Sequence, residues 1–419
     1  MKYRNYYKRE YNIFIIYLIL FLLYAYSCGF YPGHFGDTLC WREWASHNLE
    51  HGLSHAYQSW TDYLPLYHYV LYFFAKIQGS AESIFNHIHQ LRYFTLSVEF
   101  IAGFFLLKLI YDRYKSLYES VLYSMFYFFN ISMFYNTVVW GQIDGMLSSL
   151  IFISFFFAYK QKVSWSAFFY VLALNLKLQA IIFLPVIGLM LLPVIIDDFS
   201  WKNLLRWFWF PAYIQVLIIT PYIIVGDMDK IWMLITGSIG RYPSISMNAF
   251  NVWHLFLKGD LMNSSDLITF WGISYNRWGL LMFFTSSFFA LFYLLKINYQ
   301  RIRNIKNTVS LQKTLLTAGL ITLLFFYFNT QMHERYAHPA LIFLAAYVIF
   351  SKKYLVFILL SVAYFINLEA VLNQFNLFGF DGIRQVCSVL YLVVIILLFF
   401  ELYRKPSNEN IEYHCSLLQ

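Results

Sequence analysis

Apolar runs of about 15 to 22 residues alternate with short polar segments along the whole chain, and a helix needs about 20 apolar residues to cross the core of a bilayer. This pattern predicts an all-α integral membrane protein: a single polytopic bundle, residues 1–419, of about 12 transmembrane helices. The expected spans are residues 11–29, 92–111, 117–133, 143–159, 164–176, 178–195, 207–225, 278–296, 314–329, 338–351, 354–372 and 385–402.

One apolar segment does not fit this series. Residues 64–78 are short, contain Lys76, and as a full crossing would break the alternation of sides before the span at 92–111. We expect this segment to be re-entrant, or to be half of a helical pair that the sequence does not resolve.

Composition supports the membrane class. Only 12% of the residues are charged and 60% are hydrophobic, whereas soluble domains carry about 25% charged residues. The net charge of +8 comes from basic residues in short loops, as the positive-inside rule describes. We therefore expect a lipid bilayer as partner and no nucleic acid.

The basic residues also assign the sides of the membrane. The chain begins with four cations before the first span and no small-residue cleavage site follows it, which predicts a retained anchor with a cytoplasmic N-terminus. Residues 30–62 then form a large first external loop, and residues 226–277 form a second one. We expect a multi-pass protein of the cell membrane whose active site faces the extracytoplasmic side.

With these sides assigned, six polar turns share the external face. They read "HFGDTLCWREW", "WTDYLPLYHY", "NTVVWGQIDG", "LKLQ", "RYPSISMNAFNVW" and "NTQMHERYAH". Ionisable residues close to lipid are energetically unfavourable, so those that are present are candidates for a function. The clustering predicts one active site built from loops at a single membrane surface.

Asp37 is the candidate catalytic residue, because a carboxylate can act as general base on an acceptor hydroxyl. The alternative is that Asp37 caps the helix that follows it.

Two cations interrupt apolar hairpins in the external turns. Lys177 and Arg335, with His333 beside the latter, could hold a phosphate, since arginine offers a forked contact and lysine a point charge. The alternative is snorkelling to the headgroups, but Arg335 also has Glu334 and Tyr336 around it, and snorkelling needs no such neighbours.

The remaining candidates are polar residues for substrate binding. Gln142 and Asp144 stand at the mouth of a helix, where they could bind substrate or cap the helix. Asn248 and Asn251 could bond sugar hydroxyls or satisfy loop backbone. Asp62 and Gln179 come from two of the same external turns.

Cysteine and histidine spacing predicts no metal site. His47, His51 and His55 recur at helical spacing, but no matching cluster lies near them in sequence. Cys28 and Cys40 could form a disulfide in an oxidising compartment.

The ordered motifs resemble one known family. Asp37 in the first external loop, "DYLPLY", "WGQIDG", "KLQAIIFLP", "MNAFNVW" and "MHERYAHPAL" are similar to bacterial and archaeal relatives of the second GPI-anchor mannosyltransferase, within the GT-C glycosyltransferases. The resemblance covers nearly the whole chain. This sequence has Leu64 and Leu178 where the family pattern has proline.

The resemblance implies a GT-C type bundle and an inverting hexosyltransferase. It would move a hexose, by kinship mannose, from a polyprenyl-phosphate-linked donor to a glycan or lipid-linked acceptor at the extracytoplasmic face. It implies that Asp37 is the base, and Arg335, His333 and Lys177 are then the candidates to bind the leaving lipid phosphate. The donor is a substrate with a single phosphate, so we expect no cofactor and no metal.

Two other function classes stay open. A lipid-linked glycan transporter or flippase would place paired charges near the bilayer midplane, and a catalytically dead scaffold would not need both Asp37 and Arg335. Convergence of the six turns in one cavity that opens sideways to lipid would favour the enzyme, whereas a transporter should show a path between both faces.

Overall fold

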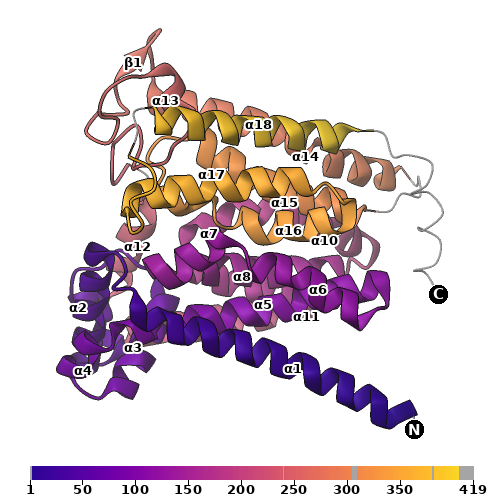
Figure 1. The fold of residues 1–419 in the computed structure, drawn as a ribbon, viewed down its shortest axis with the longest axis horizontal. Helices are drawn as coiled ribbons and strands as arrows, with labels where there is room; N and C mark the ends of the chain where they lie inside the picture. The colour runs from indigo at the N-terminus through magenta and orange to yellow at the C-terminus, as the bar shows by residue number, and fades with distance from the viewer. Residues whose placement is uncertain (1, 239, 304–308, 380–381, 405–419) are drawn as a thin grey trace.

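The computed structural model of the chain describes residues 2–238, 240–303, 309–379 and 382–404 (Figure 1). These residues form a bundle of helices with one short two-stranded hairpin. The start of α1 (Lys2–Ser27) and the end of α18 (Ile383–Tyr403) lie at one end of the bundle, while α2 (Phe35–His51), α4 (Ala81–Asn86) and the hairpin lie at the other end (Figure 1). The expected all-α membrane architecture is therefore confirmed.

Eight helices of the described residues are long and apolar enough to cross a membrane. They are α1 (Lys2–Ser27), α5 (Arg92–Tyr114), α10 (Leu184–Asp197, extended by the preceding turn η5, Leu178–Phe183), α11 (Trp201–Ile224), α14 (Tyr275–Ile302), α15 (Leu311–Phe328), α17 (Tyr354–Leu372) and α18 (Ile383–Tyr403). All eight coincide with expected spans, but the expected number of 12 is not confirmed.

The other four expected spans form shorter helices. They are α6 (Leu117–Phe128) with α7 (Ile131–Phe134), α8 (Asp144–Tyr159), α9 (Val163–Leu176) and α16 (Ala340–Ser351). At a rise of 1.5 Å per residue, the 16 residues of α8 and the 12 of α16 extend about 24 and 18 Å, less than the roughly 30 Å of a hydrocarbon core.

The short helices α8 and α16 form the centre of the bundle. All residues at positions 144–156 and 340–349 are buried, as is typical of helices that are apolar on every side. Gly319 lets α15 approach α16, because a Cβ there would lie 2.6 Å from the Cγ of Leu344. Since α8 starts at Asp144 and α16 starts just after His338, the polar ends of both helices belong to the loops of one bundle end.

The remaining elements belong to the loops. They are α2 (Phe35–His51), α3 (Pro65–Gln78), α4 (Ala81–Asn86), α12 (Met228–Thr236), α13 (Trp253–Phe256), β1 (Thr269–Phe270) and β2 (Ile273–Ser274). The segment 64–78, which we expected to be re-entrant or half of a helical pair, is α3; it is not among the eight long apolar helices and lies beside α2 and α4 (Figure 1).

Candidate functional site

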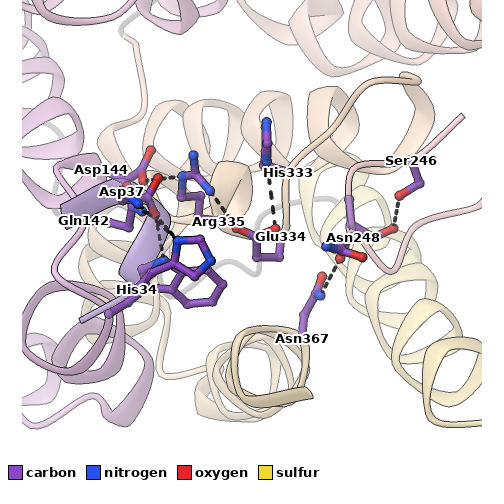
Figure 2. A network of polar contacts seen from close by, with 12 residues as sticks. His34, Asp37, Gln142, Asp144, Ser246, Asn248, His333, Glu334, Arg335 and Asn367 are labelled. Atoms are coloured by element: carbon purple, nitrogen blue, oxygen red, sulfur yellow. Dashed lines mark hydrogen bonds and ion pairs between the residues drawn. The ribbon is translucent and has the colours of Figure 1, made fainter. Parts of the chain in front are cut away.

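The six polar turns meet at the loop end of the bundle. The Asp37 turn contacts the Gln142 turn through a hydrogen bond between these two residues. Lys177 and Arg335 both pair with Asp144. An isolated β-bridge from Met247 to His333 joins the turn at 241–253 to the turn at 329–338. Arg241 lies 3.9 Å from Asp62, which links the remaining turn. Segments far apart in sequence therefore build one site, shown in part in Figure 2.

Asp37 lies in the first turn of α2, not at its cap. The cap position belongs to His34, and α2 starts at Phe35, so the capping interpretation of Asp37 is wrong. Its Oδ2 accepts hydrogen bonds from Trp140 Nε1 at 3.2 Å and Gln142 Nε2 at 2.5 Å. The side chain keeps 23% of its surface exposed, so a substrate can reach it.

His34 is the third partner of this carboxylate. Its Nδ1 lies 2.9 Å from Asp37 Oδ2 and 3.4 Å from the backbone N–H of Asp37. The first contact requires a protonated Nδ1 and the second an unprotonated one; we favour the first, because it is shorter and bonds to a charge. The hydrogen bond to Asp37 raises the pKa of His34.

The same contacts keep Asp37 ionised. Burial alone would raise the pKa of Asp37, but the hydrogen bond from His34 and the positive charge of Arg335 lower it to about 2. The carboxylate and the imidazole therefore form a coupled pair in which His34 has the higher affinity for a proton.

Two unusual backbone features bring Trp140 and Gln142 to Asp37. The turn η4 (Tyr135–Trp140) is π-helical, a form often found at functional sites. Gly141 follows with φ +89°, and a Cβ there would lie 2.8 Å from Nε of Arg92. Only glycine suits both the conformation and the space.

Arg92 joins the two segments that surround Asp37. The buried guanidinium donates through one nitrogen to the carbonyls of Cys28 (3.1 Å), Tyr31 (2.9 Å) and Val138 (2.7 Å). The backbone N–H of His34 also bonds the carbonyl of Trp140 at 3.0 Å. The geometry around Asp37 is thus fixed from behind by a buried cation.

Four charged residues beside Asp37 form what we call the charge cluster: Asp144, Lys177, Glu334 and Arg335. Lys177 Nζ lies 2.6 Å from Asp144 Oδ1, and Arg335 Nε lies 3.6 Å from Asp144 Oδ2. Arg335 also donates to Glu334 Oε1 at 2.7 Å. Arg335 lies between Asp144 and Glu334 (Figure 2), and the formal charges of the four sum to zero.

The charge cluster excludes two of the simpler interpretations. Asp144 is fully buried and starts α8 behind the cap residue Ile143, so it does not cap that helix. Lys177 and Arg335 keep 17% and 13% of their side chains exposed and are bound to carboxylates, which is not the geometry of a snorkelling side chain.

Charges within the site also set two pKa directions. Burial would lower the pKa of Arg335, but Glu334 and the other carboxylates raise it well above its ordinary value. Burial, with the nearby positive charges of Arg335 and Lys177, lowers the pKa of His333. His333 is therefore a neutral hydrogen-bonding group and not a carrier of charge.

Gln179 and Tyr336 support Lys177. Gln179 Nε2 donates to the carbonyl of Tyr336 at 2.9 Å, and the Tyr336 ring lies 4.5 Å from Lys177 Nζ, within the range of a cation–π contact. Both residues thus lie at the charge cluster.

The two candidate asparagines differ. Asn251 is fully buried, and its amide bonds the carbonyls of Phe326 (3.4 Å) and Asn329 (3.1 Å), so it satisfies loop backbone. Asn248 is half-buried beside His333 with φ +66°, and its carbonyl accepts from Asn367 at 2.8 Å. Its side chain stays a candidate for substrate.

Sequence reasoning missed His34, Trp140 and a buried network behind the cluster. Tyr364 donates to the carbonyl of Arg335 at 3.3 Å and contacts His338 Nδ1 at 3.2 Å; His338 Nε2 lies 3.8 Å from Glu99. Glu99 is an acid inside an expected span, and that signal alone could have identified it.

Within the described ranges no group of three or more histidine, cysteine or acidic residues is arranged to hold a metal ion. His47 stacks on His51 and bonds the carbonyl of His55, so this spacing serves packing. Cys28 and Cys40 are both free thiols, and the expected alternative of a disulfide is wrong.

Comparison of the chain with protein-family models and with curated proteins found no match. The functional argument therefore depends on the residues and their geometry.

Proposed function

We propose that the protein is a membrane glycosyltransferase that moves a hexose from a polyprenyl-phosphate donor to a glycan or lipid-linked acceptor. One observation carries the proposal: an accessible, ionised Asp37 lies beside a buried Arg335 and Lys177, within one site built from six loops. This places a proton acceptor next to cations suited to a phosphate leaving group.

Asp37 and His34 act on the acceptor in this proposal. The acceptor oxygen attacks C1 of the hexose while its proton passes to the Asp37–His34 pair. The bond between C1 and the phosphate oxygen breaks, so both electrons leave with the lipid phosphate and the configuration at C1 inverts. Trp140 and Gln142 hold the carboxylate in position.

The cations act on the donor. Within the described residues the guanidinium of Arg335 makes one side-chain hydrogen bond, to Glu334, which leaves other N–H groups for a phosphate. The loose 3.6 Å contact to Asp144 can give way to a ligand, whereas the 2.6 Å contact of Lys177 is a tight pair. Arg335 is thus the main phosphate ligand, and Lys177 and His333 assist it.

A transporter or flippase is the weaker alternative. The site draws its charged residues from the loops, and Asp37 and Arg335 lie together there (Figure 2), whereas alternating access uses a site near the midplane that opens to both sides. We place the site at the extracytoplasmic face on the basis of the basic loops.

The experiment is to reconstitute the purified protein in nanodiscs with radiolabelled polyprenyl-phosphate hexoses and a panel of glycan acceptors. The expected result is labelled product with one donor, lost in Asp37→Asn and retained in the exposed control Asp229→Asn. A second assay uses membranes that contain the native acceptors. If no donor lost its label in either assay, the proposed reaction would be contradicted.

A further inference from the structure

The hairpin of the second external loop carries an exposed apolar tip. β1 pairs antiparallel with β2 through Phe270 and Ile273, which leaves Trp271 and Gly272 as a two-residue turn. Both turn residues have positive φ, +52° and +75°, as a type I′ turn requires. Asparagine or glycine is the usual choice, so a bulky tryptophan here is a backbone outlier that points to a function.

We call four residues the hairpin tip. Their exposed fractions are 68% for Leu267, 51% for Ile268, 49% for Phe270 and 83% for Trp271. The rings of Phe270 and Trp271 stack with centroids 5.0 Å apart, so they form one continuous apolar surface. The sequence has no charged residue from 267 to 276. Exposed apolar surface of this kind normally has a partner.

The position of the tip identifies the partner. β2 runs directly into α14, one of the eight long apolar helices, and Trp278 in the first turns of α14 donates to the Phe270 carbonyl at 3.0 Å. Arg277 beside it is exposed. The hairpin projects sideways from the bundle beyond α13 and α18 (Figure 1), so a bilayer around the long apolar helices would lie beside it.

We propose that the hairpin tip inserts into the interfacial layer of the bilayer next to α14. Tryptophan is enriched at the level of the lipid headgroups, and Arg277 provides a cation for the phosphates of the same layer. The tip and α14 thus form one continuous lipid-facing surface.

The hairpin base connects this anchor to the site. Asp266, immediately before the tip, accepts hydrogen bonds from Thr330 Oγ1 at 2.7 Å and Gln331 Nε2 at 2.8 Å. These two residues precede Met332, whose carbonyl accepts from the backbone N–H of Met247 at 2.9 Å. The anchor therefore sets the height of the His333–Arg335 segment relative to the bilayer surface, whatever reaction the site performs.

The test is spin-label accessibility in nanodiscs. Cys40 and Cys415 are replaced by alanine, and the label is placed at Ile268→Cys, which leaves Trp271 intact. Asn263→Cys, exposed in the same loop, is the control for water, and Phe284→Cys, 64% exposed on α14, is the control for lipid. Size-exclusion profiles show that each labelled protein is folded.

The expected result is that the ratio of oxygen to nickel-chelate collision at 268 lies close to that at 284 and severalfold above that at 263. Adding Trp271→Ser should move the ratio at 268 to that of 263. A label at 268 as open to the nickel chelate as at 263 would overturn the proposal, and so would a label shielded from both reagents, because a protein partner would then cover the tip.

Discussion

Asp37 and Asp144 are two carboxylates of one site that the protein holds in opposite ways. Asp37 is 23% exposed and contacts two neutral donors and an imidazole. Asp144 has no exposed surface and contacts Lys177 and Arg335. In the proposed reaction the region around Asp37 exchanges a proton with a substrate, whereas the charge cluster around Asp144 is a compensated structure that orients its cations. Burial and the charge of the partners thus separate the proposed reactive carboxylate from the supporting one.

The largest effect is expected from removing the reactive carboxylate. Asp37→Asn keeps the shape and the hydrogen bonds to neighbouring groups but removes the base, so transfer should fall on the order of 10²–10⁴-fold. The melting temperature should fall less than in Asp144→Asn, because Arg335 keeps Glu334 and Asp144 as charged partners. Initial rates and thermal unfolding of the same preparation measure both. A variant with normal rate would show that the two carboxylates do not differ in function.

Removing the supporting carboxylate should act on stability instead. Asp144→Asn leaves Lys177 and Arg335 without their shared counter-charge, and breaking a buried ion pair costs about 3–5 kcal/mol. We expect a clearly lower melting temperature in detergent, with Asp229→Asn as exposed control. An unchanged melting temperature would mean that the charge cluster does not stabilise the fold.

The pH dependence sharpens the role of His34. A charge-assisted hydrogen bond contributes about 1.5–3 kcal/mol, so His34→Gln should lower transfer about tenfold to a hundredfold. If His34 accepts the proton, wild-type activity is lost as pH falls through its raised pKa, because the imidazole becomes protonated. The His34→Gln variant should no longer lose activity at this pH. If the loss at low pH persisted unchanged in the variant, the titrating group would be another residue.

The smallest effect is expected at the edge of the site. Asp62 is half-exposed and 3.9 Å from Arg241, and such surface pairs contribute about 0–1 kcal/mol. Asp62→Asn should therefore lower the free energy of unfolding by at most about 1 kcal/mol and the rate of transfer at most a few-fold. A loss as large as that of Asp37→Asn, measured in the same assay, would bring Asp62 into direct contact with substrate.

The sequence predicted the long helices well, and the reason is physical. A run of about 20 apolar residues has few alternatives to a membrane span, and the expected span 354–372 coincides with α17. An apolar run of 12 to 16 residues has the same sequence pattern whether it forms a membrane span or a helix buried inside the protein. The positions of α8 and α16 in the centre of the bundle could therefore not be predicted from their own residues.

The charged residues of the site were predictable, but their partners were not. Asp37, Lys177 and Arg335 are conspicuous in a chain with 12% charge. Trp140 is one of 12 tryptophans, so nothing local identifies it as a hydrogen-bond donor to Asp37. The capping interpretations of Asp37 and Asp144 were wrong because His34 and Ile143 occupy the cap positions, and the start of a helix is the part of an element that a local sequence pattern predicts least well.

The most direct measurement compares Asp37→Asn with Arg335→Ala, in nanodiscs, for equilibrium binding of the polyprenyl-phosphate donor and for transfer in a single turnover. The account predicts that Asp37→Asn binds donor normally and does not transfer, while Arg335→Ala loses both and Arg335→Lys recovers only part, because lysine cannot make the forked contact. If folded Arg335→Ala bound donor and transferred like wild type, the division of roles between the Asp37 region and the charge cluster would be contradicted.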